Sequence, residues 1–412
     1  MGASTGTRLE IDVRVEWLVL GALLLAAAAA ADQVRVGGYL KTFFTALDAP
    51  ASGEPTEGIG LTRLRLNLSW HPGENSAAEF AYTVAPRLQS TAGAEGGLPR
   101  PAPLSYRAAD VRARLYPAPG DRVGSFLVRQ NLDRAYFVYS MSFVDLQVGR
   151  QPIAFGAARV LNPTDLLAPF TYEELDKEER AGVDALRLRA ALGARGEVDV
   201  GMVLGDGLKM GEGAFFARGS FYVRQTDWTL MAVVFKENVL LGFDAARSLG
   251  GAGTWLEAGY ALAGATNDYR SEENYLRLST GLDYSFGAKS YSFVEYHFNG
   301  AGADAAADYL SQLGQTAYAQ GTVYLLGRHY LSSGFSYQIT PLLAATAQVL
   351  VNAGDGSAFI SPRCEYSLVE DVFIEFGTFL GTGASLATKT GRPRSEFGLY
   401  PRIYFSSMRF YF

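Results

Sequence analysis

Arginines occur in closely spaced pairs in this chain. Arg63 and Arg65 are two residues apart, and so are Arg187 and Arg189. Residues two apart project from the same face of an extended strand, so each pair would place two guanidinium groups on one side. A guanidinium is a planar fork that suits carboxylate and phosphate groups. These residues therefore suggest a surface that attracts anionic solutes.

A run of acidic residues stands between the two arginine pairs, in a segment that we expect to be a loop. The segment is Gln151–Gly182, and its acidic run comprises Glu173, Glu174, Asp176, Glu178 and Glu179. Thr171 with Glu174 three residues later matches a capping box, which predicts a short helix from Tyr172 to about Arg180. If the loop folds inward toward the arginines, the opposed charges would orient and filter solutes at a constriction. The alternative is the solvated face of a surface helix.

Other chemistries find little support in the sequence. The single Cys364 excludes an internal disulfide and a thiolate pair, and the three histidines argue against a histidine-rich metal centre. His297 stands two residues after Glu295 and could activate a serine, but no G-x-S-x-G turn is present. We therefore expect no enzyme activity, no cofactor and no nucleic-acid partner.

The segments that must position these residues alternate with a period of two. In Ile59–Trp70, leucines at 64, 66 and 68 point one way and the arginines at 63 and 65 point the other. The same alternation recurs to the end of the chain and places Arg277 opposite Leu276 and Leu278. Strands of about ten residues match the length that a tilted membrane strand needs. Because the apolar set is too continuous for one soluble core, lipid is the simpler acceptor.

Short and long connections alternate along the chain. This pattern predicts an all-β fold, a transmembrane antiparallel β-barrel of about 18 strands, with short periplasmic turns and long outer loops. The segment Arg87–Asn131 leaves about 16 to 20 strands open, because its alternation over Ala109–Leu115 fits either a hairpin in a loop or two more spanning strands.

The two ends of the chain carry export signals. The apolar run Trp17–Ala31 predicts a signal peptide over residues 1–31 that is cleaved before Asp32. The residues before this run are poor in net positive charge, so the true start is expected near Val13 or Val15. The mature barrel would then span residues 32–412. The alternating terminal strand Tyr404–Phe412 would pair with the first strand, because an unpaired edge strand invites aggregation. Its final Phe412 also resembles the C-terminal signature of Gram-negative outer-membrane barrels, and this resemblance implies recognition by the barrel-insertion machinery.

One internal stretch resembles a known family. V-G-R-Q-P-I-A-F-G at Val148–Gly156, followed by L-N-P-T-D-L-L at Leu161–Leu167, is similar to a segment of outer-membrane channels related to the alginate-export family. Phe155 stands where that family commonly has Trp. The resemblance implies a single-chain barrel of about 18 strands. It implies no particular substrate.

These observations predict a channel in the bacterial outer membrane for passive diffusion of small hydrophilic solutes, including anionic ones. The expected pore-lining residues are Arg63, Arg65, Arg187, Arg189 and Arg277, with the acidic run at the constriction. The expected partners are outer-membrane lipid and the solute, and a homo-oligomer is compatible with the apolar surface. Alternatives are an export conduit for an anionic polysaccharide, a barrel enzyme, and a structural sheath for an electron-transfer partner.

Overall fold

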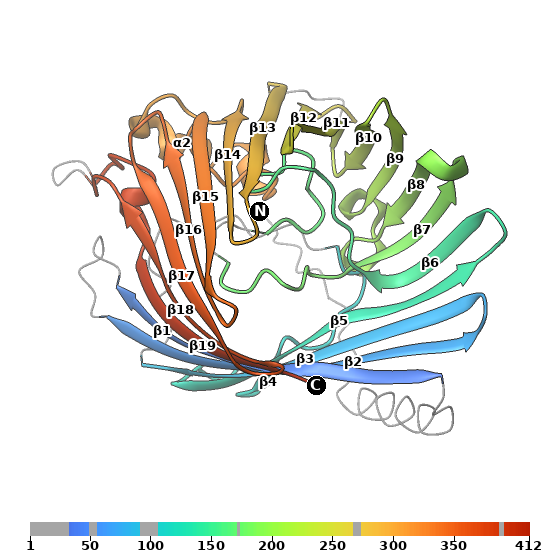
Figure 1. Cartoon of the computed structure of the whole chain (residues 1–412), viewed down its shortest axis with the longest axis horizontal. Helices are drawn as coiled ribbons and strands as arrows, with labels where there is room; N and C mark the ends of the chain where they lie inside the picture. Colours follow the sequence, from blue (N-terminus) through green and yellow to red (C-terminus); the bar gives the residue numbers. More distant parts are fainter. Residues whose placement is uncertain (1–32, 49–55, 91–105, 171–173, 267–272, 387–390) are drawn as a thin grey trace.

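The strands of the computed structural model form one antiparallel sheet that closes on itself (Figure 1). The structure describes residues 33–48, 56–90, 106–170, 174–266, 273–386 and 391–412. The strands are β1 (Val34–Asp48), β2 (Glu57–Gly73), β3 (Ser76–Gln89), β4 (Arg114–Tyr116), β5 (Phe126–Ser140), β6 (Val144–Gln151), β7 (Val183–Ala191), β8 (Gly196–Val203), β9 (Ala214–Val223), β10 (Thr226–Phe235), β11 (Asn238–Leu249), β12 (Ala252–Leu262), β13 (Tyr275–Phe286), β14 (Ser290–Asn299), β15 (His329–Thr340), β16 (Leu343–Asn352), β17 (Ala358–Val369), β18 (Val372–Thr382) and β19 (Arg402–Tyr411).

The helical elements are short and lie between the strands. They are η1 (Gly193–Arg195), η2 (Asp206–Leu208), η3 (Met210–Glu212), η4 (Ala306–Asp308), α2 (Tyr309–Gln312), α3 (Thr316–Ala319) and η5 (Phe397–Leu399). Within the described residues, no helix has the length and apolar character needed to cross a membrane.

The first and last strands close the ring. β1 pairs antiparallel with β2 on one side and β19 on the other. The backbone N–H of Gly38 donates to the Phe412 carbonyl at 2.8 Å, and the Phe412 N–H donates back to the Gly38 carbonyl at 3.1 Å. This confirms the prediction that the terminal strand pairs with the first.

Eighteen of the nineteen strands assigned in the described residues form the ring. β3 pairs directly with β5 over thirteen residues, whereas β4 pairs only with the outer part of β5. Within Arg87–Asn131, the described residues between β3 and β5 therefore form an outer loop with one short strand, not a pair of spanning strands. The predicted antiparallel barrel is confirmed, and the uncertainty in its strand number is resolved.

The alternation seen in the sequence separates the two faces of the barrel wall. Leu64 and Leu66 are each 40 % exposed on the exterior, whereas Arg65 between them is 4 % exposed. On β19, Tyr404, Met408 and Phe410 are likewise exposed. An apolar exterior around a closed sheet is the surface that lipid covers, because closure leaves no unpaired backbone groups facing the hydrocarbon.

The two ends of the barrel differ in their connections. Eight turns of two to four residues stand at one end, at positions 74–75, 141–143, 192–195, 224–225, 250–251, 287–289, 341–342 and 370–371. The other end carries the longer loops, of which 152–182, 300–328 and 383–401 are large. The predicted contrast between short turns and long loops is confirmed, although 236–237 is a short connection at the long-loop end.

The segment 152–182, here called the crossing segment, runs through the interior of the ring (Figure 1). Its described part has no helix, so the short helix predicted up to Arg180 is wrong for Glu174–Arg180. The physical reason is that Asp176, Glu178 and Glu179 bind cations on several strands of the wall, among them β1, β5 and β19, which favours an irregular backbone. The predicted signal peptide, 1–31, and Glu173 lie outside the described residues.

Candidate functional site

Side-chain hydrogen bonds at the end of β6 fix the point where the crossing segment begins. The guanidinium of Arg150 donates to the Asp184 carboxylate at 2.7 Å, to Asp110 at 2.8 Å and to the Leu132 carbonyl at 2.9 Å. Gln151 donates from its side chain to the Ala185 carbonyl at 3.2 Å. These contacts join the end of β6 to β7 and to the outer loop after β3. They give the R-Q dipeptide of the family-like motif a positioning role.

Apolar side chains then seat the first half of the segment on the inner wall. Ile153, Phe155, Leu166 and Leu167 are buried in a cluster with inward residues of β7 to β12. The Phe155 ring packs edge-on against Phe216 at 5.2 Å between centroids. This half of the segment is therefore held by burial of apolar area as well as by polar contacts.

Two wall carboxylates hold the backbone of the segment. Glu257 of β12 is fully buried and accepts hydrogen bonds from the backbone N–H groups of Ala157, Ala158 and Thr164 at 2.8 to 2.9 Å. Glu295 of β14 accepts from the N–H groups of three consecutive residues, 159–161. A buried carboxylate that lost these donors would carry a large desolvation cost, so the contacts fix the segment firmly.

His297 and Ser279 lie beneath this anchored stretch. The Ser279 hydroxyl is 2.7 Å from His297 Nδ1, and it donates to the Leu161 carbonyl at 2.5 Å. Both side chains are buried by the segment above them. Because Leu161 covers the pair, its geometry indicates a structural bridge between β13, β14 and the segment.

The second half of the segment meets the opposite wall through charges. Lys41 of β1 is fully buried, and its ammonium lies 3.1 Å from Asp176 and 2.6 Å from Glu178. Arg63 of β2 binds Asp176 at 3.1 Å, and Arg65 lies 3.3 Å from Glu179. The crossing segment thus runs from the β12–β14 wall to the β1–β2 wall.

The predicted arginines separate into two groups. Arg63 and Arg65 meet the acidic run as expected, and Arg65 also binds Asp133 of β5 at 2.8 Å. Arg187 and Arg189 do not, because β8 supplies nearer carboxylates: Arg187 binds Asp199 at 2.6 Å and Arg189 binds Glu197 at 2.7 Å. The expectation that these two would face the loop acids is therefore wrong.

Arg277 is buried against the crossing segment. Its guanidinium donates to the carbonyls of Pro163 at 3.2 Å and Thr322 at 3.1 Å. It therefore joins two loops to β13 by backbone contacts. Glu174, the remaining described member of the acidic run, is half-buried.

Asp165 is an acidic residue of the segment whose pKa is raised above its ordinary value. Asp165 is buried, and the Arg180 guanidinium binds it and also donates to the Ala168 carbonyl at 2.7 Å. Burial raises the pKa of Asp165, although Arg180 opposes this shift. This pair closes the bend of the segment on itself.

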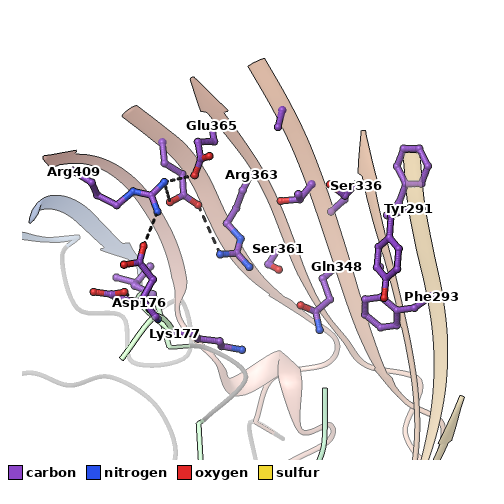
Figure 2. A pocket seen from close by; sticks show the side chains of 18 residues that line it. Asp176, Lys177, Tyr291, Phe293, Ser336, Gln348, Ser361, Arg363, Glu365 and Arg409 are labelled. Carbon is purple, nitrogen blue, oxygen red and sulfur yellow. Dashed lines mark hydrogen bonds and ion pairs between the residues drawn. The ribbon is translucent and has the colours of Figure 1, made fainter. Parts of the chain in front are cut away.

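A cavity of about 500 Å³ opens between the segment and β14–β19 (Figure 2). Arg363 and Glu365 of β17 and Arg409 of β19 stand on one side of it. Glu375 of β18 lies within 4 Å of both arginines. Tyr291 and Phe293 of β14 stand on the far side, and Ser336, Gln348 and Ser361 lie between these two groups. The volume is in the range of sites that hold small molecules.

The charges of the cavity are linked in a chain. Arg409 binds Glu365 and lies 3.6 Å from Glu375 and 3.3 Å from Glu178 of the crossing segment. Arg363 has a looser partner, since its guanidinium is 3.7 Å from Glu375. Glu178 is the residue that connects this chain to Lys41 and hence to the anchored end of the segment.

Sequence reasoning did not single out several of these residues. Lys41 was one lysine among six, and Glu257 stood in a strand whose inward face carries a single charge. The alternation of Trp255, Glu257 and Gly259 could have marked Glu257 as inward. Its role could not have been found, because its partners lie about a hundred positions away in a loop.

Comparisons with known proteins give a fold but no family. No family model and no curated protein matched the chain. Among solved structures, Acinetobacter baumannii OccAB4 is similar with a TM-score of 0.57 and 9 % identity, covering 92 % of this chain and 98 % of that chain. Pseudomonas aeruginosa OccK9 (OpdG) gives 0.56 and 10 %, with 93 % and 99 % covered.

A third similar structure is Pseudomonas aeruginosa OpdK with vanillate, with a TM-score of 0.55, 9 % identity, and 92 % and 99 % of the two chains covered. At these identities the likeness establishes the fold, which is that of outer-membrane barrels of the Occ and Opd type. The named neighbours do not show the finer resemblance to the alginate-export family.

Proposed function

We propose that this barrel is a channel of the bacterial outer membrane that admits small hydrophilic solutes carrying a carboxylate, by passive diffusion. The observation that carries the proposal is the cavity beside the crossing segment, where the guanidinium of Arg363 is partly exposed on the inner face of the barrel wall. The vanillate bound in the similar OpdK structure is an aromatic carboxylate, which supports this class of solute.

The crossing segment is the proposed constriction. It narrows the lumen because it is held at both walls, by Glu257 and Glu295 on one side and Lys41 on the other. Fixed charges of both signs at such a narrow point act on passing solutes strongly, since little water remains to screen them. Arg63 is the predicted arginine best placed for this role, because its side chain is 35 % exposed while it binds Asp176.

An export conduit is not favoured by this arrangement. A polysaccharide chain would have to displace a segment that is held by buried hydrogen bonds. A barrel enzyme is not favoured either, because the one Ser–His contact noted above lies covered by Leu161. We find no observation that favours a structural sheath.

The proposal is tested by single-channel recording of the mature chain in planar bilayers with a salt gradient. We expect stable current steps, and we expect Arg363→Gln to shift the reversal potential toward cation preference by removing an accessible positive charge from the path. Arg402→Gln is the matched control, because Arg402 shares the exterior side of β19 with Tyr404 and is exposed at the long-loop rim. Folded barrels that give no current would overturn the proposal.

A further inference from the structure

The cavity beside the crossing segment presents charges of both signs. Among its accessible groups, Arg363 is 29 % exposed, Glu365 is 44 % exposed and Glu178 is 39 % exposed. Lys177 is exposed and extends below Ser361 in the same space (Figure 2). A site for simple anions would be expected to carry an excess of cations. Here the accessible carboxylates are as prominent as the accessible cations.

The positive and negative groups are close enough to bind one small solute. Glu375 lies 3.7 Å from Arg363 and 3.6 Å from Arg409, and Arg409 is in turn bound to Glu365. Arg363 and Glu365 therefore stand at the two ends of a short chain of charges, two residues apart on the inner face of β17. Each end retains exposed surface, so each can accept a partner of opposite charge.

An aromatic shelf faces this charged wall. Phe293 lies across the backbone of β15, where a Cβ at Gly334 would stand 2.1 Å from the Phe293 ring. Glycine at position 334 thus allows the ring to lie directly against the backbone of the neighbouring strand. Phe293 and Tyr291 are both half-buried, which leaves ring surface toward the cavity (Figure 2). Serine and glutamine side chains separate the shelf from the charges.

We infer that the cavity selects zwitterionic solutes that carry an apolar ring, such as aromatic amino acids. The carboxylate of the solute would bind Arg363, its ammonium would bind Glu365, and its ring would lie on Phe293. This inference rests on the proposed function and narrows it, since a carboxylate alone would meet Glu365 and Glu178 as repulsive neighbours. A solute with both charges satisfies both ends of the wall.

The test is uptake into proteoliposomes at pH 6 with a matched set of solutes at low concentration. Phenylalanine has both charges, N-acetylphenylalanine lacks the ammonium, and phenylalanine amide lacks the carboxylate. Arabinose reports the open channel independently of charge. We expect phenylalanine to enter about three-fold faster than either blocked analogue, a ratio that fits one exposed ion-pair contact.

Three substitutions separate the roles. Glu365→Gln should remove the preference for phenylalanine and speed the entry of N-acetylphenylalanine, because Arg409 loses a partner. Arg363→Gln should slow both solutes. Gly334→Ala should displace the Phe293 ring and reduce the advantage of phenylalanine over alanine. Substitution of the exterior arginine, Arg402→Gln, should change none of these rates.

The outcomes distinguish this inference from the proposed function. Arabinose entry with equal rates for phenylalanine and its two blocked analogues would overturn the zwitterion site and leave the channel standing. Faster entry of N-acetylphenylalanine than phenylalanine in the unmodified protein would also overturn it, in favour of a simple anion site. No entry of any solute, arabinose included, would contradict the channel itself.

Discussion

Glu396 is a buried carboxylate at the long-loop end of the barrel. It accepts hydrogen bonds from the Tyr330 hydroxyl at 2.5 Å, the Leu326 N–H at 2.9 Å and the Asn352 side chain at 2.8 Å. Its own N–H donates to Asp355, which also accepts from the Tyr309 hydroxyl at 2.8 Å. Three outer loops therefore meet at this one residue.

The packing of these loops should depend on pH. Burial raises the pKa of Glu396 to about 7 from its ordinary 4.5, against the opposing effect of its hydrogen bonds, and the charge of Asp355 adds to the increase. A raised carboxylate pKa means that the folded loops favour the protonated form. The contribution of protonated Glu396 to the stability of the folded loops is therefore full at pH values below its ordinary pKa of 4.5. It is lost as the pH rises through about 7.

Hydrogen exchange measures this effect. After correction for intrinsic rates, we expect amides of 326–330 and 396–399 to be protected at least about ten-fold more at pH 5 than at pH 8.5, since one pKa unit already corresponds to that factor. Glu396→Gln should remove the difference, because glutamine stays neutral. Glu197→Gln, at an exposed ion pair near the short turns, should keep it. Equal protection of the unmodified protein at both pH values would contradict the prediction.

The crossing segment is held in two different ways along its length. Its first half combines apolar packing with the hydrogen bonds to Glu257 and Glu295. In its second half, Asp176, Glu178 and Glu179 meet cations of β1, β2 and β5, and Leu175 provides partial apolar packing. Apart from the buried Lys41–Asp176 pair, these charged contacts involve partly exposed groups, and such contacts are weaker and more sensitive to salt than buried hydrogen bonds. The second half is therefore the part expected to open first.

Lys41 is the key cation for this half, because it is fully buried and binds two carboxylates. Lys41→Met keeps a long unbranched side chain but removes the ammonium, which lies 4.1 Å from the Tyr39 ring centroid. We expect amide exchange of 175–179 to rise about ten-fold or more, because loss of the buried ammonium leaves Asp176 with Arg63 and Glu178 with Arg409 as their remaining cation partners. Lys236→Met, in an outer turn, is the matched control and should leave these amides unchanged. The prediction is wrong if both variants behave alike.

The sequence predicts the strands better than it predicts the segment inside them. Strands are readable because lipid and water impose alternation on every one of them, as with Leu64, Arg65 and Leu66. The acidic run was found because its charges are concentrated. Of its four expected partners, Arg63 and Arg65 do contact the run. Arg187 and Arg189 do not, because they have nearer carboxylates on the adjacent strand, Asp199 and Glu197. Which of two carboxylates an arginine meets depends on register, and alternation alone does not fix register.

For the whole molecule, each strand must present apolar side chains to the lipid outside and can present charged side chains to the lumen inside. The lumen gives its buried charges partners: Lys41 is paired with carboxylates, and Glu257 accepts hydrogen bonds from backbone N–H groups. In the part of the chain that the structure describes, the exterior side chains near the middle of the strands are apolar, as Leu64, Leu66 and Leu256 are, and offer no such partners. A charge introduced there should therefore be costly, and its cost should depend on depth in the membrane.

Leu256 and Val369 provide a matched pair for this prediction. Leu256 is exposed on the exterior near the middle of β12, and Val369 is exposed at the last residue of β17, beside a short turn. Leu256→Arg should lower the free energy of unfolding in lipid vesicles by about 2–4 kcal/mol, whereas Val369→Arg at the rim should cost only about 0–1 kcal/mol. The measurement is the folded fraction as a function of urea concentration. The folded fraction is read from the gel mobility of folded barrels, which changes on heating. Equal costs at the two positions would mean that the exterior is not graded by membrane depth, and the assignment of this surface to lipid would fail.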